Sequence, residues 1–196
     1  MSSRIFLLRH GQSQANVTGL VASNRTNAAA AFGLTSLGRD QVRASVGAAM
    51  AAGELPPGCP IVCSPLLRAV QSAQEAAAIL GGDVRVDDRL IERAFGSLEL
   101  GPDDAYEGVW SEDREDPGHE RWGVESTRAI LERGASLLRE LAEGPNATVL
   151  STHGDVASVL FCASLGLPLG RHREVGPLAN GELRLLAHGL PPARPA

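Results

Sequence analysis

Lysine is absent from this 196-residue sequence, so all 18 of its basic side chains are arginine. A lysine Schiff base and a Walker-type phosphate loop both require a lysine, and neither is available to this chain. The basic residues are outnumbered by 23 acidic ones, which gives a formal net charge of −5. Nucleic acids and anionic membranes select basic surfaces, so this charge balance argues against both as partners.

Cysteine and long apolar runs are also scarce. The three cysteines, Cys59, Cys63 and Cys162, stand in or beside apolar stretches without a Cys-x-x-Cys pair, which predicts buried thiols rather than zinc ligands. No apolar run reaches the eighteen residues of a membrane-spanning helix. The four apolar residues at 5–8 are too few for a signal-peptide core, so we expect a cytoplasmic protein.

The length is that of one domain, and it suffices to bury a core without disulfide bonds. Hydrophobic residues make up 43% of the chain and charged residues 21%, which is ordinary for a globular protein. We therefore expect one domain over residues 1–190, followed by a flexible tail at 191–196. Residues 87–125 are rich in charge, Gly and Pro, and we expect them to form a lid or insert.

Short apolar runs alternate with helical patterns along the chain. This alternation is typical of a mainly parallel sheet with helices on both faces, so the predicted fold is α/β, a three-layer α/β/α sandwich. The predicted strands are 5–8, 61–63, 84–86, 148–151 and 183–187, and the predicted helices are about 35–53, 66–80, 103–112, 126–143 and 155–165.

Reactive residues directly follow three of the predicted strands, at the edge where such sheets bind ligands. His10 and His153 are 143 positions apart, yet each comes just after a strand, and Arg68 follows a third. Each stands near a turn or helix start, where free backbone N–H groups attract anions. The sequence therefore predicts a compact cationic pocket that suits a phosphate.

Several segments, in order along nearly the whole chain, resemble the signatures of the histidine phosphatase superfamily in its phosphoglycerate-mutase-like branch. A lone Arg-His-Gly would be weak evidence, whereas the ordered set is specific. The segments are Arg9-His10-Gly11, Leu34-Thr35-x-x-Gly38-x-x-Gln41, Ser64-Pro65-Leu66-Leu67-Arg68-Ala69, Leu90-Ile91-Glu92-Arg93, Gly123-Val124-Glu125-Ser126 and Ser151-Thr152-His153-Gly154.

The resemblance implies a phosphoglycerate-mutase-like fold and catalysis through a phosphohistidine, without a metal ion or other cofactor. Attack by a neutral imidazole divides one difficult hydrolysis into two easier steps. Arginine suits the site because its planar guanidinium can pair with two phosphoryl oxygens. The implied roles are His10 as the nucleophile, Glu92 as the general acid, and Arg9, Asn16, Arg68, His153 and Gly154 as phosphate-binding residues, His153 also being catalytic.

Some positions leave alternatives open. Glu99, seven residues after Glu92, is an alternative proton donor. Asp155 is predicted to cap a helix, because carboxylates favour helix N-termini, and a further role in orienting a substrate group stays open. His172-Arg173 is either a solvated pair or part of a loop that reaches over the pocket.

The few aromatic residues carry a second open question. Tyr106, Trp110 and Trp122 all fall within 87–125, where they would form either a packed lid over the site or a minor satellite core.

The function predicted from these residues is hydrolysis of a small phosphorylated metabolite, with a small-molecule phosphate ester as the partner. The resemblance also suggests a homodimer. The alternatives are a phosphoglycerate mutase-type phosphotransferase, a catalytically silent phosphate-binding module and a metallohydrolase. The motifs describe a phosphoryl pocket, so the identity of the ester stays open.

Overall fold

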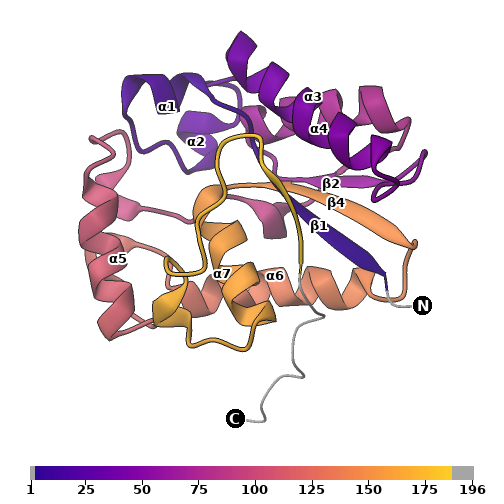
Figure 1. Ribbon diagram of the computed structural model, residues 1–196. Coiled ribbons are helices and arrows are strands. Elements are labelled where there is room, and N and C mark those ends of the chain that lie inside the picture. Colours follow the sequence, from indigo (N-terminus) through magenta and orange to yellow (C-terminus); the bar gives the residue numbers. More distant parts are fainter. Residues whose placement is uncertain (1–2, 187–196) are drawn as a thin grey trace.

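The computed structural model describes residues 3–186, which contain a five-stranded sheet (Figure 1). Its strand order is β3-β2-β4-β1-β5, with four parallel strands and an antiparallel β5 at one edge. The strands are β1 (Arg4–Arg9), β2 (Ile61–Cys63), β3 (Val84–Val86), β4 (Ala147–Thr152) and β5 (Leu183–Leu185).

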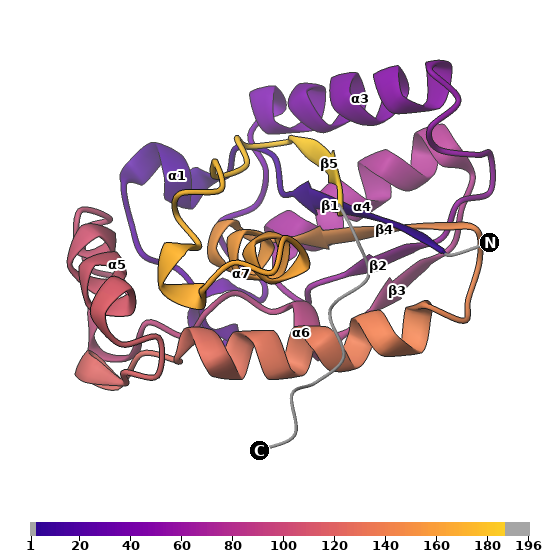
Figure 2. The same ribbon diagram turned by 60° about the horizontal axis from the view of Figure 1, so that its bottom comes forward.

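Helices cover both faces of this sheet (Figure 2). One face carries α3 (Ser36–Ala51) and α4 (Leu67–Leu80), and the other carries α6 (Thr127–Leu141) and α7 (Gly154–Ser164). Alternate residues of β1 serve the two cores: Phe6 packs in the α3/α4 cluster and its neighbour Leu7 in the α6/α7 cluster. The α/β fold with a mainly parallel sheet and three layers is therefore confirmed.

The remaining elements lie mostly beyond the carboxyl ends of β1 and β4 (Figure 1). The prediction of a short helix within 87–125 corresponds to α5, whereas α1 and α2 were not predicted. The bounds are α1 (Gln14–Thr18), α2 (Arg25–Ala28) and α5 (Ala105–Glu115), with 3-10 helices at Asp88–Leu90, Gly96–Leu98, Arg121–Gly123 and Leu169–Arg171.

The loop after β1 is held against the start of α3. A Cβ atom at Gly11 would overlap the backbone of Gly38, so this close approach requires glycine. The backbone N–H of Gln12 donates to Oε1 of Gln41 over 2.9 Å, and the Thr35 N–H donates to the Gln12 carbonyl over 3.0 Å. The Leu-Thr-x-x-Gly-x-x-Gln segment thus fixes the residues that follow His10.

The other sequence predictions have mixed outcomes. All three cysteines are buried and unbonded to one another, as predicted. Asp155 is not a cap: His153 is the N-cap of α7, and Asp155 lies inside its first turn. No helix among residues 3–186 is long and apolar enough to span a membrane. Ala187, predicted to end the last strand, and the tail at 191–196 lie outside the described residues.

Candidate active site

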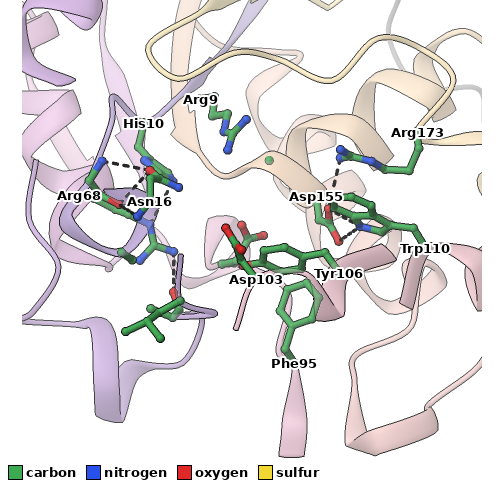
Figure 3. A pocket seen from close by; sticks show the side chains of 16 residues that line it. Arg9, His10, Asn16, Arg68, Phe95, Asp103, Tyr106, Trp110, Asp155 and Arg173 are labelled. Carbon is green, nitrogen blue, oxygen red and sulfur yellow. Dashed lines mark hydrogen bonds and ion pairs between the residues drawn. The ribbon is translucent and has the colours of Figure 1, made fainter. Parts of the chain in front are cut away.

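A cavity of about 240 Å³ opens at the carboxyl ends of β1 and β4 (Figure 3). Six of the seven predicted site residues line it; the seventh, His153, lies fully buried behind the lining. The residues on its walls come from segments far apart in the sequence, because parallel strands bring their ends to one edge of the sheet.

His10 is buried, and one of its two ring nitrogens carries no proton. Its Nδ1 lies 2.8 Å from the carbonyl oxygen of Gly11, which can only accept, so Nδ1 carries the proton. Its Nε2 accepts a hydrogen bond from Nε of Arg68 over 3.1 Å. Burial, and then the charges of Arg68 and Arg9, lower the pKa of His10 well below its usual value. The ring is therefore neutral, with a lone pair on Nε2.

Arg68 and Arg9 are each anchored to the backbone and each keeps an unsatisfied N–H group. Arg68 donates through Nη2 to the carbonyl of Ala22 over 2.8 Å, and Arg9 through Nη1 to that of Leu178 over 2.7 Å. Among the described residues, the buried Nη1 of Arg68 and Nε of Arg9 have no partner. Buried donors without partners are costly, so this arrangement suits an anion that would satisfy them.

His153 brings a third unsatisfied atom to the same place. Its ring centroid is 5.2 Å from that of His10, and its Nε2 lies 2.7 Å from Oγ of Ser64. Its buried Nδ1 has no hydrogen-bond partner within residues 3–186, and it lies 4.0 Å from Oε2 of Glu92. Gly154 then opens α7, and the N-terminus of a helix attracts anions.

Glu92 lies beside these donors, and its pKa is raised. Its Oε1 accepts from the backbone N–H of Arg93 over 2.9 Å. Burial, and then the charge of Asp155, raise the pKa of Glu92 to about 7, although Arg68 acts in the opposite direction. A carboxyl group with this pKa can give and take a proton near neutral pH.

Glu99, the alternative proton donor, lies elsewhere. Its carboxylate accepts from the backbone N–H of Ser23 over 2.9 Å, from the Ser23 hydroxyl, and from the Asn24 N–H over 3.2 Å. It is absent from the cavity lining, whereas Glu92 belongs to it. The structure thus places Glu92 at the cavity and uses Glu99 to shape the loop before α2.

Asn16 lies at the exposed rim. Its Oδ1 accepts from the backbone N–H of Ser13 over 3.0 Å and from Nδ2 of Asn180 over 3.2 Å. Asn180 also donates to the carbonyl of His10 over 3.3 Å, so the rim residues hold one another in place. The oxygen of Asn16 is occupied, and its amide NH2 is the group left to meet a ligand.

Aromatic residues form the far wall of the cavity. The rings of Tyr106 and Trp110 stack at 5.4 Å, and Phe95 packs edge-on against Tyr106 at 4.8 Å. Both α5 residues line the cavity, which favours the lid interpretation for them. Trp122 is 44% exposed and does not line the cavity.

The loop after α7 reaches this wall, so His172-Arg173 is not a solvated pair. The guanidinium of Arg173 lies 3.7 Å from the ring centroid of Trp110, and His172 is fully buried. Asp155, which the sequence suggested as a cap, instead accepts from Nε1 of Trp110 over 3.0 Å and faces Arg173 at 3.5 Å.

Sequence reasoning missed a buried ion pair behind this wall. Arg93 donates to both carboxylate oxygens of Asp113 over 2.6 and 2.8 Å, and both side chains are fully buried. Arg93 also donates to the carbonyl of Glu125 over 2.7 Å. The available signal was the spacing of Val109 and Asp113, which places an acid on the inner stripe of the helix. The pair ties α5 to the residue that follows Glu92.

Among residues 3–186, no group of three or more His, Cys, Asp and Glu side chains is arranged to hold a metal ion.

One family model and several known proteins match this chain. The family model described as the histidine phosphatase superfamily (branch 1) matches residues 5–189. A glucosyl-3-phosphoglycerate phosphatase of Mycolicibacterium vanbaalenii is 30% identical over 197 residues, covering 94% of this chain and 84% of the relative. A bifunctional protein of Mycobacterium tuberculosis is 32% identical over 164 residues; the match covers 81% of this chain but only 40% of that relative.

A solved structure shows the same fold. It is that of a mycobacterial glucosyl-3-phosphoglycerate phosphatase in complex with VO3, and it superposes with a TM-score of 0.74 at 30% sequence identity. The superposition covers 93% of this chain and 90% of that chain.

Proposed function

Because this chain belongs to branch 1 of the histidine phosphatase superfamily, we propose that it is a phosphomonoesterase that forms a phosphohistidine on His10. The observation that carries the proposal is that Nε2 of His10 has no proton and keeps a lone pair for attack. It lies at a cavity where the described residues leave buried nitrogen atoms of Arg9 and Arg68 without partners, and a third such nitrogen, on His153, lies just behind the lining.

In the first step, Nε2 of His10 attacks phosphorus. Arg68 releases its hydrogen bond to Nε2 and turns that N–H to a phosphoryl oxygen. As the nitrogen–phosphorus bond forms and the bond to the alcohol oxygen breaks, Glu92 gives its proton to the departing oxygen. Charge is spread over the phosphoryl oxygens in this step, so prearranged donors stabilise it more than the ground state.

In the second step, the Glu92 carboxylate takes a proton from water, and the water oxygen attacks the phosphorus. The bond to His10 breaks, which returns the neutral imidazole and releases inorganic phosphate. A pKa of about 7 lets Glu92 serve in both directions near neutral pH. In this scheme Arg9, Arg68 and His153 supply the charge stabilisation, so it requires no metal ion.

A small phosphorylated metabolite is the proposed substrate class. The cavity of about 240 Å³ has room for a phosphoryl group and part of its alcohol. The names of the relatives make glucosyl-3-phosphoglycerate the first natural ester to test.

Hydrolysis of p-nitrophenyl phosphate in excess EDTA, by wild type and His10→Ala, tests the proposal. We expect chelator-resistant activity that falls on the order of 10⁴-fold or more in the variant. When the reaction with a ³²P-labelled ester is quenched during turnover, the wild-type protein should carry the labelled phosphoryl group and His10→Ala should not. Equal activity in both proteins, or loss of activity in EDTA, would contradict the proposal. Interconversion of 2- and 3-phosphoglycerate without phosphate release would instead favour a mutase.

A further inference from the structure

Ser64 and His153 form a buried pair next to the cavity. Ser64 follows β2 and His153 comes just after β4; these parallel strands are neighbours, with Cys63 opposite Ser151. Both side chains are fully buried, and Oγ of Ser64 lies 2.7 Å from Nε2 of His153. The short distance requires one hydrogen between the two atoms, supplied by either the hydroxyl or the ring.

The hydrogen bonds of Ser64 decide which group supplies it. The backbone N–H of Leu66 donates to Oγ of Ser64 over 3.3 Å, and an amide N–H can only donate. Within residues 3–186, Nε2 of His153 is then the only acceptor in reach of the Ser64 hydroxyl hydrogen. If the ring donated instead, that hydrogen would be left without an acceptor in a site closed to water.

The other side of the ring favours the same assignment. Burial, and then the charge of Arg68, lower the pKa of His153 well below its usual value, so the ring is neutral and carries one N–H. Its Nδ1 faces Oε2 of Glu92 at 4.0 Å. An unprotonated Nδ1 would face two acceptors there, the ionised form of Glu92 and the incoming phosphoryl oxygens, whereas an Nδ1–H group complements both.

We propose that Ser64 is a positioning residue whose hydroxyl donates to Nε2 of His153 and so holds the ring proton on Nδ1, facing the phosphoryl oxygens. This inference rests on the proposed function for its role in catalysis. The two histidines are then oriented in opposite senses. The Gly11 carbonyl holds the His10 proton on Nδ1 and leaves the lone pair of Nε2 free to attack. The Ser64 hydroxyl holds the His153 proton on Nδ1, so that the neutral ring donates a hydrogen bond from that nitrogen.

Nitrogen NMR on histidine-labelled protein tests the tautomer directly. Two-bond ¹H–¹⁵N correlations distinguish the protonated from the bare ring nitrogen, and a His153→Asn sample assigns the signals. We expect wild-type His153 to carry its proton on Nδ1, and Nδ1 to shift when inorganic phosphate is added. A proton on Nε2 in the wild type would overturn the inference, even if no Ser64 variant folds. This measurement needs no turnover, so it succeeds or fails separately from the proposed activity.

Kinetics of matched variants test the role. In Ser64→Ala we expect the His153 proton to redistribute between the two nitrogens, and kcat and kcat/KM to fall together by about 10- to 100-fold. Ser64→Thr, which keeps the hydroxyl, should retain the tautomer and most of the rate. Ser158→Ala is the control, because that α7 hydroxyl is also fully buried but has no hydrogen-bond partner among the described residues. An unchanged tautomer in Ser64→Ala, or an equal loss in Ser158→Ala, would contradict the proposal.

Discussion

The two ends of the cavity are built in different ways. At the end proposed to bind the phosphoryl group, here called the phosphoryl end, Arg9 is the last residue of β1, and His10 and His153 directly follow β1 and β4. The atoms that orient these side chains are mostly backbone carbonyls and a neighbouring hydroxyl. At the far end, Tyr106 and Trp110 lie on α5, outside the sheet, and Trp110 contacts Arg173 of the loop after α7. The first end takes its precision from the sheet, and the second from contacts between side chains.

From this difference we expect the two ends to have separate roles, one in the reaction and the other in selecting the substrate. The phosphoryl end offers donors that any phosphate ester could use. The far wall offers ring faces, the cation of Arg173 and the carboxylate of Asp103, which can distinguish one alcohol from another. Substitutions at the phosphoryl end should therefore lower the rate for every ester, and those at the far end should change preference.

Glu92→Gln should show the largest effect short of removing the nucleophile. For an alkyl phosphate, which needs its leaving oxygen protonated, we expect phosphoenzyme formation to slow by about 10²- to 10⁴-fold. For p-nitrophenyl phosphate, whose leaving group is a weak base, the loss in that step should be much smaller. Rapid-quench measurement of the first turnover checks this, and equal losses for both esters would rule Glu92 out as the acid.

The pH dependence of the same step tests the protonation of Glu92. Since burial and Asp155 raise its pKa to about 7, wild-type phosphoenzyme formation from the alkyl ester should decline as the pH rises through 7. The acid loses its proton over that range. This decline should vanish in Glu92→Gln, and its persistence there would assign the titration to another group.

Asp113→Ala tests what holds the far wall in place. The substitution removes the two short hydrogen bonds of buried Arg93 and leaves Asp155, at 3.4 Å, as its nearest carboxylate, so we expect a loss of about 3 kcal/mol in the free energy of unfolding, the lower end for a broken buried pair. Urea titration measures this loss. Glu115→Ala on the exposed side of α5 is the control and should cost little. A small change for Asp113→Ala would show that other contacts anchor the helix.

Arg68→Lys tests the phosphoryl end with the charge retained. A lysine cannot reproduce the fork that now reaches Nε2 of His10 and the carbonyl of Ala22 together. We expect kcat to fall by about 100- to 1000-fold for every ester, in line with the loss of one prearranged donor. A loss confined to some esters would place Arg68 in selectivity rather than in phosphoryl transfer.

Arg173→Ala should give the smallest and most selective effect. For an ester whose alcohol bears a carboxylate, loss of this cation should raise KM by about tenfold, the contribution expected of one charged hydrogen bond. For p-nitrophenyl phosphate, which has no distal anion, KM should stay within about twofold. Equal changes for both esters would mean that Arg173 supports the whole cavity and does not sort substrates.

Most of the phosphoryl end could be predicted from the sequence because its residues sit in short, contiguous motifs. His10 and His153 each follow a strand directly, so locating the strands was enough to place both at one edge of the sheet. Glu92 was harder, since Glu99 lies seven residues away and the chain between them is irregular. Only the folded structure shows that the Glu99 carboxylate accepts hydrogen bonds from the backbone and hydroxyl of Ser23, away from the cavity.

The far wall could not be predicted in the same way. Asp155 follows a histidine motif at a helix start, and local reasoning made it a cap. Its partners include Trp110 and Arg93, 45 and 62 positions before it, and Arg173, 18 positions after it. The pairing of Arg93 with Asp113 likewise depends on where α5 packs, which no local pattern encodes.

By itself, the sequence determined the alternation of strands and helices, the edge of the sheet where His10 and His153 emerge, and the residue types that gather there. These follow from local periodicity and from the geometry common to parallel sheets. The tertiary structure decided that Glu92 lines the cavity and Glu99 does not, which partners surround the two histidine rings, and which side chains form the wall opposite them. Those features depend on burial and on partners distant in the chain, and both exist only once the chain has folded.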